Sequence, residues 1–209
     1  MLTNRQKAET VAAQRGAAAL AAVDLRARCA SLRLAPPAAD GAVTIRVFGQ
    51  DVRLAPPDFS AVVTSSGQPA RLTDRILAIH YLLCDVPVEP TGQWISFREF
   101  TGGPFYWGAF CSRSVKPLIS RIGNDLELLR QNLGRFEWRP MDLPTSVAPI
   151  PLLAARIHSL GAIETSLIYR QGDDELEPTA ELLFDACARR VLRAEDASVI
   201  ASRICLGLL

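Results

Sequence analysis

The chain contains 209 residues, 49% of them hydrophobic and 22% charged, and its formal net charge is +1. This composition can bury a large core, and it excludes an intrinsically disordered, fibrous or low-complexity protein. Because a nearly neutral chain has no strong overall field, we expect neither nucleic acid nor a membrane surface as its partner. Length and composition do not indicate a reaction.

The N-terminal part predicts a long helix, from Asn4 to about Leu32. The stretch is rich in Ala, the best helix former, and contains no Pro. Thr3 or Asn4 can cap its first turn. We expect residues 1–35 to form this helix, which either packs on the rest of the chain or binds a partner. Residues 36–209 then form one α+β domain.

The same stretch argues for a cytoplasmic protein. Its apolar run at positions 16–23 is too short for a bilayer, which needs about 20 residues. The charges that precede this run are of both signs, unlike those of a secretory signal. The cysteines are widely spaced and none forms a Cys-x-x-Cys pair, so we expect free thiols. They are Cys29, Cys84, Cys111, Cys187 and Cys205.

Short strands follow the N-terminal helix. Residues 43–48 alternate between apolar and other side chains, as a strand with one buried face does. A turn at Gly49-Gln50 leads into a second strand at 51–54, which predicts a hairpin. Residues 59–63 predict a third strand.

The clearest helix covers Leu72 to Cys84. Its side chains are apolar nearly all round, which predicts a buried helix at the centre of the fold. Thr73 or Asp74 can cap its start. His80 lies among its apolar residues, where a histidine can ligate a metal or a haem-like cofactor, act as a base, or remain a neutral core residue.

The rest of the chain predicts a mixture of strands and helices. We expect strands at 94–100, 136–139 and 162–170, and helices at 112–121, at 125–131 and from Ala194 onward. Residues 101–104 predict a turn, and residues 105–110 an aromatic, buried segment. Residues 152–160 fit a helix or a strand, and residues 180–192 are ambiguous. Hairpins and helices without regular alternation indicate an α+β fold with an antiparallel sheet.

The most informative stretch for function is Thr91 to Phe110. It combines aromatic side chains with a cation, a carboxylate and a Gly-Gly turn. Aromatic walls and a planar guanidinium suit a pocket for a flat or anionic ligand, and glycine amides can approach a ligand closely. The alternative is a core segment with a surface Arg98–Glu99 pair. The candidate ligand-binding residues here are Trp94, Arg98, Glu99, Gly102, Gly103 and Tyr106.

Common catalytic motifs are absent from the sequence. It contains no P-loop, no Gly-x-Gly-x-x-Gly, no Gly-x-Ser-x-Gly and no His-Glu-x-x-His motif. With two histidines it cannot form a three-histidine metal site. Cys111 precedes a possible helix start near Arg113, so it is either an activated thiolate or a small buried residue. The acidic turn at 173–177 either binds a cation or is solvated.

Several blocks resemble a known family. The sequence reads DRILAIHYLL at 74–83, TGQWISFREFTGG at 91–103, DDELEP at 173–178 and LLFDACA at 182–188. Together they resemble a prokaryotic family of unknown function that is frequent in anaerobes, over roughly residue 43 to the C-terminus. The resemblance implies no established activity. Some members resemble parts of anaerobic one-carbon, corrinoid and iron–sulfur metabolism, and some carry a cysteine-rich cluster module whose cysteines this chain lacks.

The resemblance adds further candidates and three functional hypotheses. It directs attention to Asp74, His80, Glu175 and Asp185, besides the residues of the aromatic stretch. The first hypothesis is a protein that binds a small molecule, cofactor or protein partner without catalysis, as an accessory factor in anaerobic corrinoid or one-carbon metabolism. The second is an enzyme that uses Glu99, Asp185 or Glu175 as acid or base and Arg98 as an anion anchor. The third is a scaffold that docks through the N-terminal helix. The sequence names no cofactor and no oligomeric state.

Overall fold

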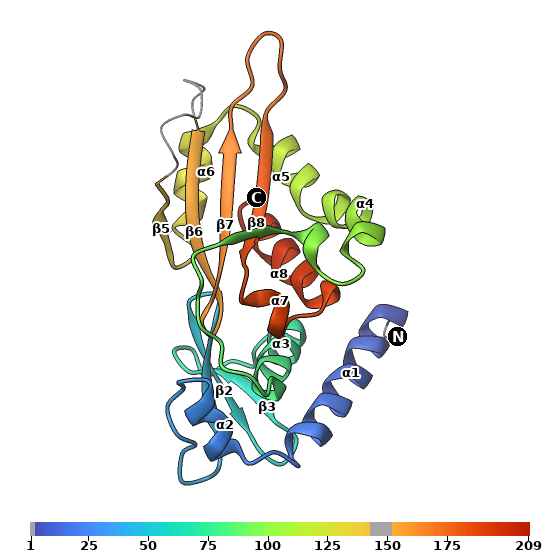
Figure 1. Ribbon diagram of the computed structural model, residues 1–209, viewed down its shortest axis with the longest axis vertical. Coiled ribbons are helices and arrows are strands. Elements are labelled where there is room, and N and C mark those ends of the chain that lie inside the picture. Colours follow the sequence, from blue (N-terminus) through green and yellow to red (C-terminus); the bar gives the residue numbers. More distant parts are fainter. Residues whose placement is uncertain (1–2, 143–151) are drawn as a thin grey trace. The chain divides into compact units, whose positions relative to one another are not determined.

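The structure is a computed structural model that describes residues 3–142 and 152–209 (Figure 1). The described chain forms two compact units, one within Met1–Glu89 and Leu160–Ala162, the other within Pro90–Ser159 and Ile163–Leu209. Helices and antiparallel strands occur in both units, which confirms the α+β class. The domain boundary expected at residue 35 stays a prediction.

In the first unit, the N-terminal helix ends earlier than predicted. Helix α1 covers Asn4–Leu20, and Thr3 caps it by accepting the Gln6 N–H on its hydroxyl at 3.2 Å. A turn then separates α1 from a second helix, α2 (Leu25–Ser31). Asp24 causes this break, because its carboxylate accepts two backbone N–H groups as the N-cap of α2.

The three predicted strands of this unit are confirmed. Strand β1 (Val43–Val47) pairs antiparallel with β2 (Gln50–Ala55), and β2 pairs with β3 (Ser60–Val63). The β1–β2 turn is Phe48-Gly49, one residue earlier than expected, and both residues have positive φ. Positive φ at both central residues is typical of the tight hairpin turn that matches strand twist.

The central helix of this unit, α3, covers Leu72–Leu83 and is largely buried. Arg71 is its N-cap and provides no side-chain bond, so the expected capping by Thr73 or Asp74 is wrong. Gly16 of α1 lies against Ile79, which lets α1 pack closely on α3. The β6–β7 turn at 160–162 also belongs here, and its Ala162 N–H donates to the Tyr81 hydroxyl at 3.1 Å.

The second unit contains an antiparallel sheet in the order β5-β6-β7-β8-β4. Its strands are β4 (Trp94–Ser96), β5 (Trp138–Pro140), β6 (Leu152–Leu160), β7 (Ile163–Arg170) and β8 (Thr179–Asp185). Its helices are α4 (Gly103–Arg113), α5 (Val115–Ile122), α6 (Leu126–Leu133), α7 (Ala188–Val191) and α8 (Ala194–Gly207). Residues 152–160 are thus a strand, and the ambiguous 180–192 segment divides between β8 and α7.

Three local predictions in this unit are wrong. The strand expected to reach residue 100 ends at Ser96, because Ser96 caps a 3₁₀ helix, η1 (Phe97–Glu99). The helix expected over 112–121 does not begin at Ser112, because residues 112–113 end α4 and a separate helix, α5, begins at Val115. Part of the segment expected to be buried is exposed, since Phe105 is 93% and Tyr106 is 55% accessible. Among the described residues, no helix has both the length and the apolar character needed to cross a membrane.

Candidate functional site

Three aromatic rings of the Thr91–Phe110 stretch, those of Phe97, Phe100 and Phe110, form the core beside η1. The Phe97 ring stacks on Phe110 with centroids 4.2 Å apart, and Phe100 meets Phe184 edge-on at 5.2 Å. Phe97, Phe100, Phe110 and Phe184 are all buried. These buried rings therefore hold η1 and α4 on the sheet and do not themselves face a ligand.

Arg98 and Glu99 are neighbours in η1, but their side chains contact different groups. The Arg98 guanidinium carbon lies 4.4 Å from the centroid of the Trp107 ring, in a cation–π contact. The Glu99 carboxylate accepts the Ser96 N–H at 2.8 Å and so closes the capping box of η1. Among the described residues no ion pair joins Arg98 to Glu99.

Trp94 lies on the opposite face of the sheet from the aromatic core. It pairs in register with Asp185, whereas its neighbour Ile95 pairs with the buried Phe184. Since side chains alternate along a strand, Trp94 and Phe184 face opposite sides. The Arg156 guanidinium lies 5.3 Å from the Trp94 ring. The structure thus does not bring Trp94 into one cluster with the core aromatic rings.

Asp185 is a buried carboxylate with a full set of donors. It accepts the Thr91 N–H and hydroxyl at 3.0 Å, the Gly92 N–H at 2.8 Å and the Cys187 N–H at 2.9 Å. Burial opposes its ionisation, but the hydrogen bonds from Thr91, Cys187 and Gly92 outweigh burial and lower the pKa of Asp185. The ionised carboxylate of Asp185 therefore connects the loop before β4 to the end of β8 through hydrogen bonds.

The Gly102-Gly103 pair is required by packing at the start of α4. Gly102 has φ +81°, in the left-handed region that favours glycine. A side chain on Gly103 would overlap the carbonyl oxygen of Phe97. The Gly103 N–H donates to the Phe100 carbonyl at 2.8 Å. This amide is therefore already used within the turn.

The remaining candidates belong to other elements of the fold. His80 and Asp74 are on α3, in the first unit, and Glu175 is exposed in the β7–β8 loop. Cys111 is half-buried, and burial raises its thiol pKa, which disfavours an activated thiolate. No group of His, Cys, Asp and Glu in the described residues is arranged to hold a metal ion.

A cavity of about 310 Å³ opens beside the predicted Gly-Gly turn. One wall is Thr101, which directly precedes the turn, and the other walls come from α7 and the beginning of α8. The lining residues are Thr101, Arg189, Leu192, Arg193, Ala194 and Glu195. We call this hollow the arginine cavity.

Two arginines make the arginine cavity positively charged. Arg189 and Arg193 are exposed, and within residues 3–142 and 152–209 neither forms an ion pair. Arg193 is also the N-cap of the 14-residue α8, whose first amides point toward this end. Glu195 adds one carboxylate. The arrangement can bind an anion through guanidinium groups and helix amides while the carboxylate accepts a bond from a second ligand group.

Sequence reasoning missed both arginines. Arg189 belongs to the ambiguous segment 180–192 and Arg193 directly follows it, so the sequence does not indicate that the two side chains line one cavity. One signal was available: Arg189, Arg190 and Arg193 directly precede the acidic first turn at Glu195.

Fold and site together define an α+β protein with a small cationic cavity and no recognisable catalytic constellation in its described part. A profile of the family described as Domain of unknown function (DUF3786) matches residues 24–206. The chain belongs to this family, as its sequence blocks indicated. No curated protein is significantly similar to the chain. No solved structure is either.

Proposed function

We propose that this protein binds a small anionic molecule in the arginine cavity and does not transform it. The supporting observation is that Arg189 and Arg193, which form no ion pair with any described residue, line a cavity of about 310 Å³. This volume is near the lower end for small-molecule pockets, which span about 300–1,000 Å³. The occupant is therefore a metabolite-sized ligand.

The lining narrows the chemistry of the ligand. Arg189 and Arg193 provide planar donors that match a carboxylate or a phosphate. Glu195 repels a second negative charge but accepts a hydrogen bond, so it favours a ligand that also carries an amine or hydroxyl group. Thr101 adds a hydroxyl to the lining. We expect a monocarboxylate or a phosphate monoester with one such donor group.

Binding without catalysis is favoured by the state of the candidate acids. Asp185 is saturated with hydrogen bonds and its pKa is lowered, the reverse of what a general acid at neutral pH needs. The Glu99 carboxylate is engaged by the Ser96 N–H, and Glu175 lies at an exposed loop tip. The enzyme hypothesis would need a carboxylate facing the ligand, and Glu195 is the one in the cavity lining.

The finer expectation, a role in anaerobic corrinoid or one-carbon metabolism, remains a proposal about context. A whole corrinoid is far larger than the arginine cavity, so only a side group of such a cofactor would enter it. Small carboxylates and phosphates of one-carbon chemistry fit the volume better. Docking through the N-terminal helix is the weaker alternative, because α1 packs on α3 through Gly16.

The test is a ligand screen followed by titration of variants. Thermal unfolding is measured with small carboxylates, phosphate monoesters, folates and corrinoids. A binding ligand at ten times its dissociation constant stabilises the protein by about 1.4 kcal/mol. Calorimetry then compares Arg189→Gln and Arg193→Gln with the control Arg190→Gln, an exposed neighbour that does not line the cavity.

We expect each cavity variant to weaken binding by about tenfold or more, because hydrogen bonds to charged groups contribute about 1.5–3 kcal/mol. The control should bind within about twofold of the wild type. If no anion stabilises the protein, or if Arg190→Gln weakens binding as much as the cavity variants, the proposal is wrong.

A further inference from the structure

Helices α4 and α5 present a surface that combines exposed aromatic rings with uncompensated positive charge. Residues 100–124 contain no Asp or Glu. The buried sides of the two helices carry Phe110 and Leu118. Their exposed sides form what we call the aromatic–cationic face. Its members are Phe105, Tyr106, Arg113, Lys116 and Arg121.

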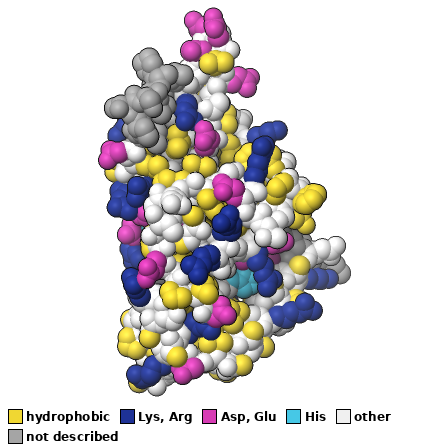
Figure 2. All heavy atoms as spheres, in the orientation of Figure 1, with side chains coloured by type: hydrophobic (Ala, Val, Ile, Leu, Met, Phe, Trp, Pro, Cys, Tyr) yellow, Lys and Arg dark blue, Asp and Glu magenta, His cyan; other side chains and the backbone are white. Residues whose placement is uncertain are grey.

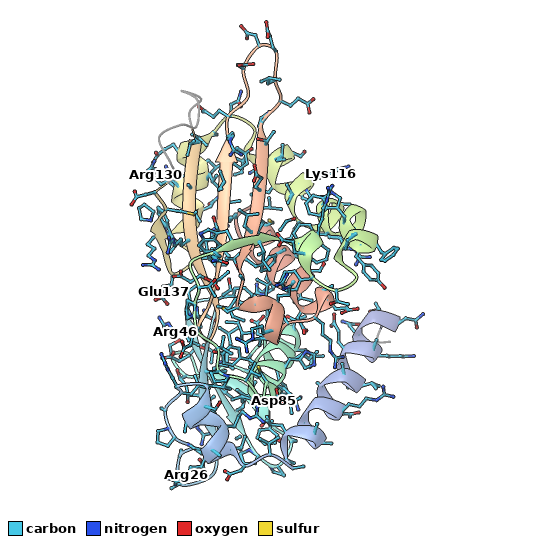
Figure 3. All side chains as sticks on the ribbon, viewed as in Figure 1. Arg26, Arg46, Asp85, Lys116, Arg130 and Glu137 are labelled. Atoms are coloured by element: carbon cyan, nitrogen blue, oxygen red, sulfur yellow. The ribbon has the colours of Figure 1, made fainter. Side chains whose placement is uncertain are left out.

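Two members of this face, Tyr106 and Arg113, are aligned along α4, and Lys116 and Arg121 extend the positive charge onto α5. Tyr106 and Arg113 are seven residues apart, which is close to two helical turns, so they share one side of α4. Lys116 lies just beyond the junction of α4 and α5 (Figure 3). Phe105 is 93% exposed, so its ring contributes almost nothing to the core. Among the described residues, none of the three cations of this face forms an ion pair.

The same chain carries a segment of the opposite character. The β7–β8 loop exposes residues 173–177, which include four carboxylates and Leu176, itself 60% accessible. We call residues 173–177 the acidic tip. Figure 2 shows the acidic side chains gathered at the end of this loop. No carboxylate of the acidic tip forms an ion pair with a described residue.

The acidic tip is preorganised. The Asp173 carboxylate accepts the N–H groups of Glu175 at 2.9 Å and Leu176 at 2.8 Å, and the Asp173 N–H donates to the Leu176 carbonyl at 2.9 Å. These bonds fold the loop around Leu176 and keep its side chain outside. A segment that is already ordered loses little conformational entropy when it binds.

We propose that the acidic tip of one copy docks on the aromatic–cationic face of a second copy. Four carboxylates then meet three cations, and Leu176 contacts Phe105 and Tyr106. The opposite charges, the exposed apolar side chains on both surfaces and the absence of ion pairs between either surface and any described residue all favour this occupant. Because the two surfaces differ, the contact is heterologous, and it closes into a dimer only if two copies exchange tips reciprocally.

The decisive experiment exchanges the charges. One variant, Asp174→Lys with Glu175→Lys, reverses the tip, and another, Arg113→Glu with Lys116→Glu, reverses the face. Sedimentation equilibrium of each variant alone should show self-association weakened by at least about tenfold, since each exposed pair contributes up to about fivefold. A mixture of the two should associate again, because the lysine tip of one variant fits the glutamate face of the other.

Salt and matched variants complete the test. Wild-type association should weaken strongly near 1 M salt, where the screening length falls to about 3 Å. The controls Arg26→Glu and Asp85→Lys each reverse a single charge on the other unit and should leave association unchanged (Figure 3). Circular dichroism and urea unfolding establish that every variant is folded.

Three results would overturn the proposal. They are a wild-type protein that stays monomeric at all concentrations and low salt, association that survives both charge reversals, and a mixture that fails to associate. A monomeric protein whose face binds anionic vesicles or an oligonucleotide assigns the face to another partner and also overturns it. Arg189 and Arg193 take no part in the contact, so this test is independent of anion binding.

Discussion

Asp185 shows how a single residue connects a loop to the sheet. Its carboxylate accepts bonds from Thr91, Gly92 and Cys187 while it is only 2% exposed. A buried charge is tolerated only when such donors replace water. The hydrogen-bonded carboxylate therefore holds the Thr91–Gly92 turn against β8, next to the start of β4.

We predict that Asp185→Asn lowers the free energy of unfolding at pH 7 by about 1.5–3 kcal/mol, because the bonds lose their charge and the amide NH₂ group faces donors. The lowered pKa of Asp185 means that its stabilisation is present above the unfolded pKa of about 3.9 and is lost as pH falls through the folded pKa. Urea unfolding at pH 7 and near pH 3 measures both effects.

The matched control is Asp174→Asn, since Asp174 is exposed and forms no ion pair with a described residue. It should change stability by less than about 0.5 kcal/mol at either pH. If the difference in unfolding free energy between wild type and Asp185→Asn stays constant as the pH falls, the ionised Asp185 carboxylate does not stabilise the fold.

Residue types alone could not distinguish side chains that bind a ligand from side chains that stabilise the fold. Glu99 and Asp185 looked like candidate acids in the sequence, but backbone N–H groups engage both of them. Arg98 looked like an anion anchor and lies on the Trp107 ring. Each of these partners is decided by local backbone geometry, which residue identity does not reveal.

At the scale of elements, α4 contains two glycines with opposite roles. The start of α4 lies so close to η1 that a side chain at Gly103 would overlap the Phe97 carbonyl. Gly108, in the middle of the same helix, is exposed and has open space where a side chain would lie. Glycine in a helix interior destabilises the helix by about 0.5–1 kcal/mol relative to alanine.

We therefore predict opposite signs for the same substitution. Gly103→Ala should destabilise the protein by about 1–3 kcal/mol, because the backbone of η1 must shift to make room. Gly108→Ala should stabilise it by about 0.5–1 kcal/mol. Thermal and urea unfolding of both variants gives the comparison, and a stabilising Gly103→Ala would show that η1 and α4 are not in close contact.

Elements with strong local signals were predicted well. The β1–β2 hairpin, α3 and α6 follow from alternation and apolar periodicity, and α6 begins at Leu126, one residue after the start expected at Asp125. The Trp94–Phe100 segment was misread because its apolar residues fit a strand over the whole segment as well as a strand followed by η1. The deciding feature is the Ser96–Glu99 capping box, which competes locally with strand extension.

At the scale of the whole molecule, the burial of the cysteine side chains shows how tightly both units are packed. Cys29, Cys84, Cys187 and Cys205 are buried, whereas Cys111 is half-buried. Burial raises the pKa of the Cys205 thiol to about 12. Burial also raises the pKa of Cys187, with the Asp185 carboxylate adding to the effect.

We predict that a thiol reagent modifies one cysteine of the native protein and five cysteines of the urea-unfolded protein. The native reaction should be slow at neutral pH and faster at alkaline pH, because burial raises the pKa of Cys111. Mass spectrometry after timed labelling locates the site, and Cys111→Ser serves as the control. Rapid native labelling at a second position would show that one of the cores opens.

By itself the sequence determined the class of fold, the family and the positions of most helices and strands, because these depend on composition and on patterns between neighbouring residues. Only the tertiary structure decided which side chains meet. Strand alternation places Trp94 across the sheet from Phe184, and the α7–α8 bend brings Arg189 and Arg193 to the wall beside Thr101. A cavity joins residues nearly ninety positions apart, and no local pattern encodes such a distance.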